Sequence, residues 1–269
     1  MDPRKEPDVT TPVWNTTLPS SRQVLLPDEV HVWHVPLSLD RALLPAWTRM
    51  LSVQERLIAA GFPSERALHP GDVCEMTRED YIAYRSALRL LLARYLGHTP
   101  EEVIIATDAH GKPFLDTSTG DDLFRFNSSH SWGHALIALT RRRSIGIDLQ
   151  RIDPSGAIFS IAQNRFSPRT FAALQALPIP ERLQAFFRLW SLHEAYFKCL
   201  GHAESWKDVT IFLASSPAEP AILQTPWEQN SCALCEIDPA LSGYTAALAV
   251  TGPQYRLSYW QLPVTALAR

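Results

Sequence analysis

The segment 77–96 carries the most regular hydrophobic pattern of the sequence and constrains the fold more than any other stretch. Its apolar positions recur at intervals of three and four residues: Tyr81, Tyr84, Leu88, Leu91 and Tyr95. That spacing is typical of a helix with one buried face. Thr77 can cap the start of this helix and Gly97 can end it. The sequence therefore predicts a long helix whose apolar side lies in a hydrophobic core.

Shorter patterns on either side of this helix indicate a mixed fold. Strands are predicted at 30–37, 103–106, 134–140, 144–150, 244–251 and 255–261. Further helices are predicted at 52–60 and at about 180–200. This order of strands and helices indicates the α+β class, with two similar halves that meet near residue 143. We therefore expect an N-terminal half at 30–143 and a C-terminal half at 144–269.

The first 29 residues differ from the rest of the chain. They contain five of the 21 prolines, among Thr, Ser, Asp and Asn, and show no apolar period. A segment of this composition buries too little apolar surface to fold by itself. We expect 1–29 to be a disordered, proline-rich tail.

Charge and composition exclude several classes of protein. The chain has 25 Lys and Arg against 28 Asp and Glu, a net charge of −3, which argues against a nucleic-acid binder with a general basic surface. No apolar run approaches the roughly 20 residues of a membrane span, and the N-terminus lacks the apolar core of a secretion signal. We expect a cytoplasmic protein with no nucleic-acid and no membrane partner.

The cysteines support the same compartment. Four cysteines are too few for a disulfide framework and suit a reducing cytosol. Cys232 and Cys235 are spaced like half of a zinc site, but no second pair or nearby histidine completes it. A buried strand or turn is the simpler interpretation of this pair.

Two polar motifs precede residue 143. In Gly111-Lys112-Pro113 the proline fixes the backbone, so that Lys112 projects from a rigid turn; a solvated lysine is the simpler alternative. The segment 126–131 surrounds His130 with hydroxyl groups that can donate to an anion, although a polar loop explains it equally well. A serine nucleophile activated by His130 is less favoured, because Ser129 and His130 point to opposite faces of an extended segment.

Two further motifs follow residue 143. In 145–150, alternation places Asp148 and Gln150 on one strand face, where their oxygens can hold Mg²⁺; a half-exposed edge strand is the alternative. On the last predicted helix Glu194 and Lys198 share a face, with His193 at its side; a surface ion pair is the alternative. Together the four motifs provide for one divalent cation, several phosphates and a carboxylate that accepts a proton.

The order and spacing of these motifs resemble the 4′-phosphopantetheinyl transferases of the Sfp type. The resemblance rests on Gly111-Lys112-Pro113, Phe126-Asn127, Ser129-His130-Ser131, Gly146-Ile147-Asp148 and the segment 190–198. Leu51-Ser52, Glu55-Arg56 and Tyr84-Arg85-Ser86 also resemble the N-terminal half of that family. The similarity spans about residues 50–200, and we expect it to extend over the whole body of the chain from 30 to 262.

This resemblance implies a pseudo-twofold pair of α+β halves, with the active site in the cleft between them, and a monomer. It implies transfer of the 4′-phosphopantetheine arm of coenzyme A to a serine of an apo acyl-, peptidyl- or aryl-carrier protein. Adenosine 3′,5′-bisphosphate would be released. Mg²⁺ is the implied cofactor, and coenzyme A is the co-substrate.

The resemblance also implies roles by position. The residues that would bind coenzyme A around its adenosine and 3′-phosphate are Arg85, Ser86, Lys112, Pro113, Ser129 and His130. Asp148, Gln150 and Glu194 would hold Mg²⁺. Lys198 would neutralise the bridging phosphates and Glu194 would take the serine proton, so that Asp148, Glu194 and Lys198 form the catalytic set.

Two positions depart from the family pattern. Gln150 stands where the family usually has a glutamate, and His193 where it usually has a lysine. An amide oxygen can still ligate Mg²⁺, with one negative charge fewer. His193 would bind phosphate as a cation, and its ordinary pKa of about 6.5 makes that charge conditional near neutral pH. A catalytically impaired coenzyme A-binding module on the same fold is the alternative that these departures leave open.

Overall fold

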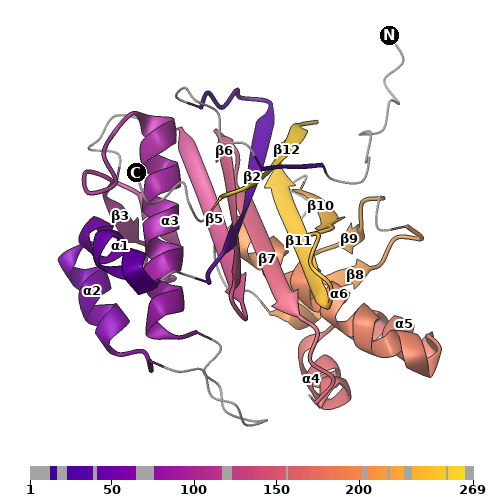
Figure 1. The fold of residues 1–269 in the computed structure, drawn as a ribbon. Helices are drawn as coiled ribbons and strands as arrows, with labels where there is room; N and C mark the ends of the chain where they lie inside the picture. The colour runs from indigo at the N-terminus through magenta and orange to yellow at the C-terminus, as the bar shows by residue number, and fades with distance from the viewer. Residues whose placement is uncertain are drawn as a thin grey trace.

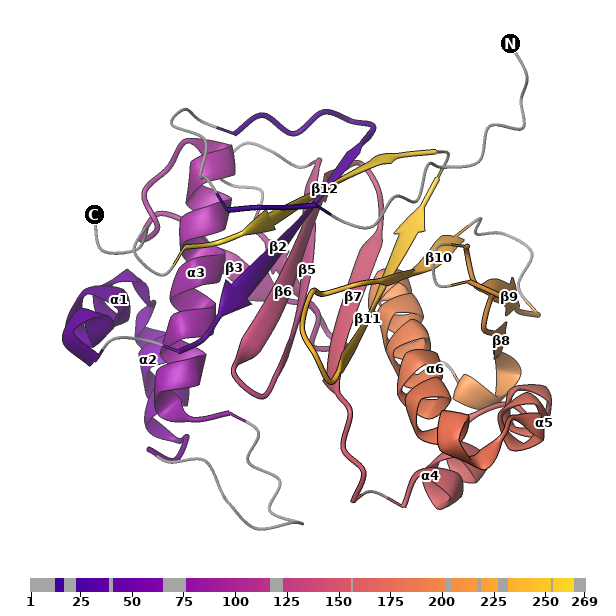
Figure 2. The ribbon, with the colours of Figure 1, turned by 45° about the vertical axis from the view of Figure 1, so that its right-hand side comes forward.

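A computed structural model describes residues 13–16, 23–38, 41–64, 76–116, 123–155, 157–201, 205–216, 219–226, 232–252 and 254–263. Two β-sheets, of five and three strands, lie between two long helices, α3 (Arg78–Leu96) and α6 (Ile179–Leu200) (Figures 1 and 2). Each sheet thus packs on one long helix. The predicted α+β class is confirmed.

The larger sheet has the strand order β1-β12-β2-β6-β5. Its strands are β1 (Trp14–Asn15), β2 (Glu29–Pro36), β5 (Phe124–Ser131), β6 (His134–Arg141) and β12 (Arg256–Gln261). Strands β2, β6 and β5 are antiparallel neighbours, whereas β1 pairs parallel with β12 and β12 pairs parallel with β2. The segment 126–131, for which a polar loop was one interpretation, is therefore part of a strand.

Helix α3 begins and ends as its sequence predicts. Thr77 Oγ1 accepts from the Asp80 N–H, and the Asp80 carboxylate accepts from the Thr77 N–H. This capping box satisfies two N–H groups that the first helical turn leaves free. Gly97 ends the helix with a φ of 77°, a conformation that glycine adopts without strain.

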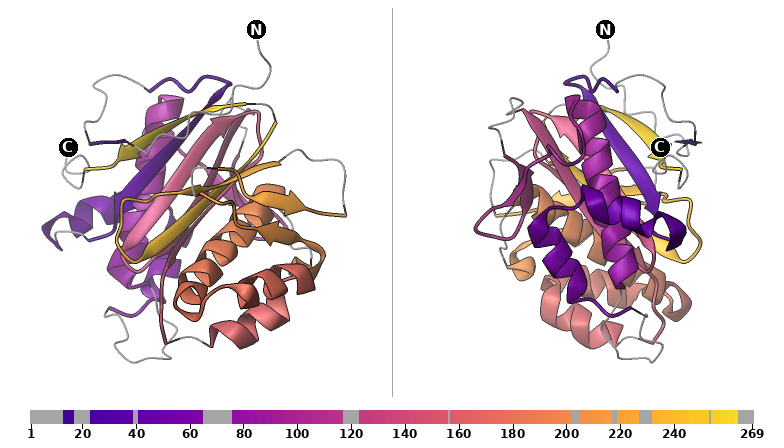
Figure 3. Two further views of the ribbon diagram at one scale, coloured as in Figure 1. Left: turned by 90° about the vertical axis from the view of Figure 1, so that its right-hand side faces the viewer. Right: turned by 60° about the vertical axis from the view of Figure 1, so that its left-hand side comes forward.

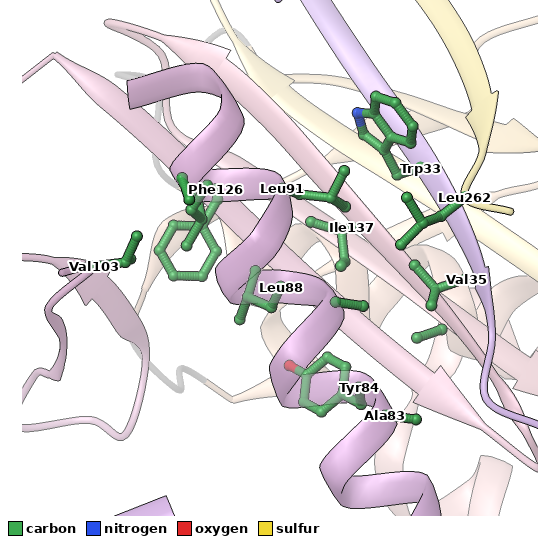
Figure 4. Packing of buried hydrophobic residues seen from close by; sticks show 14 of the residues in the cluster. Trp33, Val35, Ala83, Tyr84, Leu88, Leu91, Val103, Phe126, Ile137 and Leu262 are labelled. Atoms are coloured by element: carbon green, nitrogen blue, oxygen red, sulfur yellow. The ribbon is translucent and has the colours of Figure 1, made fainter. Parts of the chain in front are cut away.

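One face of α3 packs on the larger sheet (Figure 4). Leu88 and Leu91 meet Trp33 of β2 and Ile137 of β6 in this core. Beside α3 lie the short helix η1 (Arg41–Leu43), α1 (Leu44–Met50) and α2 (Val53–Ala60) (Figure 3). The hairpin of β3 (Ile105–Thr107) and β4 (Pro113–Leu115) follows the end of α3.

The smaller sheet has three antiparallel strands in the order β10-β11-β7. These are β7 (Ile145–Arg151), β10 (Cys232–Ile237) and β11 (Tyr244–Thr251). Helix α6 packs on the face that points away from the larger sheet. Next to α6 lie α4 (Ile158–Arg165), α5 (Pro168–Ala176), η3 (Trp206–Asp208) and the hairpin of β8 (Thr210–Phe212) and β9 (Ile222–Gln224).

The two sheets face each other through a third apolar core. Val30 and Val32 of β2 and Leu136 of β6 pack with Ile147 of β7 and Leu248 of β11. Strands β2, β6, β7 and β11 are therefore covered on both faces, by the other sheet on one side and by a helix on the other. This four-layer arrangement places the edge strands β5 and β7 beside each other.

The division of the chain into halves at 30–143 and 144–269 stays a prediction, and one strand crosses it. Strand β12 comes from the C-terminal part of the sequence but pairs with β2 from Glu29 to His34. It ties the end of the chain to the N-terminal sheet.

The segment 1–29 lies mostly outside the described residues, but its described parts are ordered. Trp14 and Asn15 pair with β12, and the Trp14 indole donates to the carbonyl of Asp238 at 3.3 Å. Its ring packs against Tyr259. At these residues the structure differs from the expected disordered tail, because Trp14 packs against Tyr259. Among the described helices, none combines the length and apolar character of a membrane span.

Candidate active site

Ser129, Asp148 and Lys198 meet where β5, β7 and α6 approach one another. The Lys198 ammonium donates to Asp148 Oδ1 at 2.6 Å and to Ser129 Oγ at 3.1 Å. Ser129 Oγ donates to the same aspartate oxygen at 2.9 Å. Asp148 is buried, whereas the Lys198 side chain is 28% exposed. Three motifs that are distant in the sequence thus form one polar cluster that solvent can reach.

Side chains of β5 connect the two sheets at this cluster. Asn127 Oδ1 accepts from the N–H of Ile147 at 2.9 Å, and Ser131 Oγ accepts from the N–H of Arg151 at 3.1 Å. Alternate residues of a strand share a face, so Ser129 lies between these two bridges and also points toward β7. The polar side chains of 126–131 therefore connect β5 to β7, and the Ser129 hydroxyl lies in the site.

Gly146 allows α6 to lie directly on β7. A Cβ atom at this position would overlap with Ala195 O and Cys199 N of the helix backbone. Only glycine fits such a close approach of helix and strand. The approach brings Lys198 within hydrogen-bonding distance of Asp148, two residues further along the strand.

Glu194 lies one helical turn before Lys198 and is half-buried. Burial raises the pKa of its carboxyl group above the ordinary value; Lys198 opposes the rise, Asp148 adds to it and Arg165 opposes it. A raised pKa brings a carboxylate closer to the value at which it exchanges protons efficiently near neutral pH. A half-buried carboxyl group with a raised pKa is suited to exchange a proton.

The oxygens around Asp148 fit a hard cation. Asp148 Oδ2 is buried and has no hydrogen-bond partner in the described structure. Gln150 follows on the same strand face, and Glu194 is close enough to interact with Asp148 electrostatically. Two carboxylates and an amide match the oxygen ligands that Mg²⁺ prefers. Across the described ranges no three His, Cys, Asp or Glu side chains form a ready-made metal site, so water or phosphate oxygens would complete the coordination.

His130 lies near Lys198 on the β5 side of the site. Its ring packs against that of Tyr84 with centroids 5.3 Å apart, and the Tyr84 hydroxyl is hydrogen-bonded to Ser128 Oγ at 2.5 Å. Burial, and then the Lys198 charge, lower the pKa of His130. The uncharged ring can still donate one hydrogen bond to a phosphate.

The structure separates the two candidate residues on α3. Arg85 binds the Glu55 carboxylate and keeps 13% of its side chain exposed. Ser86 is fully buried and donates to the carbonyl of Trp47 at 2.8 Å. One residue along a helix turns the side chain by about 100°, which carries Ser86 into the core. Ser86 is therefore not brought to the site.

The motif Gly111-Lys112-Pro113 lies where the β3–β4 hairpin turns. Pro113 begins β4 and is half-buried. The Lys112 ammonium donates to the backbone carbonyl of Lys198 at 2.5 Å. Lys112 thus lies near the site, with its charge directed at the end of α6.

His193 lies in the core of the C-terminal half. Its fully buried ring stacks on Phe166 and Trp206, with centroids 4.8 and 5.1 Å away, and its Nδ1 is hydrogen-bonded to the carbonyl of Leu189 at 2.7 Å. Burial lowers the pKa of His193 to about 4. The ring is uncharged at neutral pH, so its placement gives no support to a phosphate-binding cation at this position.

Two further residues lie beside the site and were assigned no role from the sequence. Tyr84 belongs to the motif Tyr84-Arg85-Ser86 and to the apolar period of α3, yet its hydroxyl reaches Ser128 of β5. Arg165 ends α4 and acts electrostatically on Glu194. No sequence pattern marks Arg165, which only its position in the folded chain associates with the site.

The comparisons with known proteins agree on one family. Residues 144–249 match the model of the 4′-phosphopantetheinyl transferase superfamily. The chain is 34% identical over 238 residues to the 4′-phosphopantetheinyl transferase HetI of Nostoc sp.. The aligned residues make up 88% of this chain and 93% of that protein. It is 28% identical to the 4′-phosphopantetheinyl transferase gsp of Aneurinibacillus migulanus, over 58% of this chain and 69% of the relative.

Similarity to solved structures is lower. A holo-(acyl-carrier-protein) synthase from Bacillus anthracis, in complex with CoA (3′,5′-ADP), has 17% sequence identity and a TM-score of 0.35. The matched part covers 40% of this chain and 94% of the synthase.

Proposed function

This chain belongs to the 4′-phosphopantetheinyl transferase superfamily and is an enzyme of that kind, and we propose that it transfers the phosphopantetheine arm of coenzyme A to a serine of an apo acyl-, peptidyl- or aryl-carrier protein. The reaction uses Mg²⁺ and releases adenosine 3′,5′-bisphosphate. One chain supplies both β5 and α6 to the site, which is consistent with a monomer.

The cluster of Ser129, Asp148 and Lys198 is the observation that carries this proposal. A buried carboxylate with one unpartnered oxygen stands beside a partly exposed ammonium group. This pairing suits a ligand that carries several negative charges together with a divalent cation. Coenzyme A combined with Mg²⁺ is such a ligand.

The transfer breaks one phosphoanhydride bond and forms one phosphate ester. The carrier serine oxygen attacks the phosphorus that bears the pantetheine arm, and the oxygen of the adenosine 5′-phosphate leaves with the electron pair of the broken bond. The serine proton goes to a base. Alignment and neutralisation of charge supply most of the rate enhancement in such a reaction.

The roles fall to Asp148 and Lys198 of the cluster and to Gln150 and Glu194 beside it. Glu194 accepts the serine proton, directly or through water, since its raised pKa suits a base. Lys198 neutralises charge on the bridging phosphates. Asp148, Gln150 and Glu194 would hold Mg²⁺, which supplies Lewis-acid stabilisation of the pyrophosphate when bound.

The test is to incubate the protein with coenzyme A, Mg²⁺ and a panel of apo acyl- and peptidyl-carrier proteins, and to weigh the carriers by mass spectrometry. We expect one phosphopantetheine arm on the modified carrier and none with Asp148→Ala. If no carrier gains mass although the protein binds coenzyme A, the chain is a binding module and the proposal is wrong.

A further inference from the structure

Lys112 has a set of contacts that binding of coenzyme A does not explain. Its ammonium donates to the carbonyl of Lys198 at 2.5 Å and lies 3.4 Å from the carbonyls of Ile145 and Cys199. All three acceptors belong to the backbone. Two of them end α6, and the third begins β7.

The carbonyls at the end of α6 are groups that the helix itself leaves free. The last four carbonyls of a helix have no partner within it, and a cation placed there satisfies them and opposes the negative end of the helix dipole. Such a cation often comes from the last helical turn. Here it comes from the β3–β4 hairpin of the other half, and it packs against Gly201, which ends the helix.

The turn that carries Lys112 is closed by its own hydrogen bonds. Asp108 Oδ1 accepts from the N–H groups of His110 and Lys112, each at 2.9 Å. The N–H of Asp108 in turn donates to the carbonyl of Lys112 at 3.0 Å. Pro113 fixes the backbone on the other side of Lys112. The lysine therefore projects from a stiff base.

We propose that Lys112 is a positioning residue that holds the last turn of α6 against the start of β7. Lys198 lies in that turn and Asp148 lies three residues along that strand, so the contact of Lys112 sets how the two approach each other. The inference rests on the proposed transfer reaction for its effect on rate. In this role the Lys112 ammonium binds backbone carbonyls and does not bind the 3′-phosphate of coenzyme A.

Steady-state kinetics with two substrates separate these two roles. In Lys112→Met we expect kcat to fall about 10- to 100-fold with coenzyme A and equally with 3′-dephospho-coenzyme A, because small misplacements of catalytic groups reduce rates by this much. KM should change by less than about twofold. Lys112→Arg, which keeps a donor, should recover part of kcat. A rise of KM confined to coenzyme A, with no penalty on the dephospho substrate, would overturn the proposal.

Hydrogen exchange tests the same inference without any transfer activity. In Lys112→Met we expect faster exchange of the amides in the last turn of α6, with the rest of α6 unchanged. Arg125→Met is the matched control, because Arg125 carries a charge near Lys112 but donates to the carbonyl of Phe124. Unchanged exchange in Lys112→Met contradicts the inference. If the wild-type protein modifies no carrier but this exchange result holds, the proposed function fails and the positioning contact stands.

Discussion

Each half of the molecule contains a buried carboxylate that binds cationic side chains, and the two differ in how completely they are satisfied. In the N-terminal half, Glu55 Oε1 accepts from Arg85, while Oε2 accepts from Arg89 and from the N–H of Ser52. Both oxygens are used. In the C-terminal half, one oxygen of Asp148 is used and the other has no partner in the described structure.

This difference distinguishes a fully hydrogen-bonded ion pair from a carboxylate with one oxygen unpartnered in the described structure. Glu55 completes the capping box of α2 and connects that helix to α3, so both of its oxygens accept hydrogen bonds from groups within the fold. Asp148 Oδ2 is buried without a hydrogen-bond partner in the described structure, which is unfavourable unless a ligand binds there, as we propose. Burial and charge alone do not distinguish the two groups. The two carboxylates differ in the number of hydrogen bonds that each oxygen accepts.

The largest effect should follow from Asp148→Ala. Loss of the carboxylate removes a ligand of the proposed cation and the partner of Lys198, so we expect the transfer rate to fall by about 1,000-fold, or about 4 kcal/mol. Stability should change little. Carrier mass gain over time and urea unfolding measure the two quantities. Asp153→Ala, at an exposed aspartate that follows β7, is the control and should keep its activity. A matching loss in both variants would contradict the role of Asp148.

Glu55→Gln should show the opposite pattern. Removing one partner of a buried ion pair leaves Arg89 without its counter-charge, so we expect a loss of about 3 kcal/mol in the free energy of unfolding. The kcat of the folded enzyme should stay within about threefold. Urea unfolding and kinetics at low temperature test both parts. A large fall in kcat without loss of stability would place Glu55 in the reaction and remove the contrast with Asp148.

His193 is buried in the core beside the site, and its titration should affect the stability of the fold and not the rate of the reaction. The folded-state pKa of His193 is lowered from 6.5 to about 4, so the unfolded chain binds more protons between these values. Stability is therefore fully present above about pH 6.5 and is lost as pH falls toward 4. We expect His193 to contribute a loss of about 2 kcal/mol between pH 7 and pH 5.

His193→Phe should remove this contribution of about 2 kcal/mol from the pH dependence while kcat at pH 7 stays nearly constant. His34, whose pKa burial also lowers to about 4, contributes in the same direction in both proteins. Urea unfolding at a series of pH values is the measurement. An identical slope in the variant would show that His193 is already protonated in the folded state.

The smallest effect concerns the cation ligands beside Asp148. Gln150→Glu adds a negative charge on the same strand face, so we expect the Mg²⁺ concentration for half-maximal rate to fall by about tenfold, or about 1.4 kcal/mol. Rates measured over a Mg²⁺ titration provide the test. An unchanged or higher requirement would show that residue 150 lies outside the coordination shell.

Much of the fold could be predicted from local patterns. The period of 77–96 and its caps correctly predict α3, and alternation correctly predicts β2, β6, β7 and β11 within one or two residues. Strand pairing across the chain could not be predicted. That β12 lies beside β2 depends on contacts between residues more than 200 positions apart, which no local period reports.

The candidate site, like the fold, was predicted in part from local sequence patterns. Asp148, Glu194 and Lys198 come together as their motifs indicate, because a two-residue period on a strand and a four-residue period on a helix decide which side chains share a face. Their assigned roles stay predictions. Ser86 lies next to Arg85 and His193 next to Glu194, but both are buried in the core, since neighbouring positions on a helix point in different directions.

The sequence by itself determined the elements and the chemical groups that the site can use. Helical and strand periods, caps and glycines are local, so they can be recognised in a single chain. Only the tertiary structure decided which groups stay available to a ligand. Lys112 satisfies the end of a helix, Glu55 is saturated by two arginines, and Asp148 keeps one oxygen unpartnered. The reason is that hydrogen bonding is a property of neighbours in space, and the closest neighbours of these groups are distant in sequence.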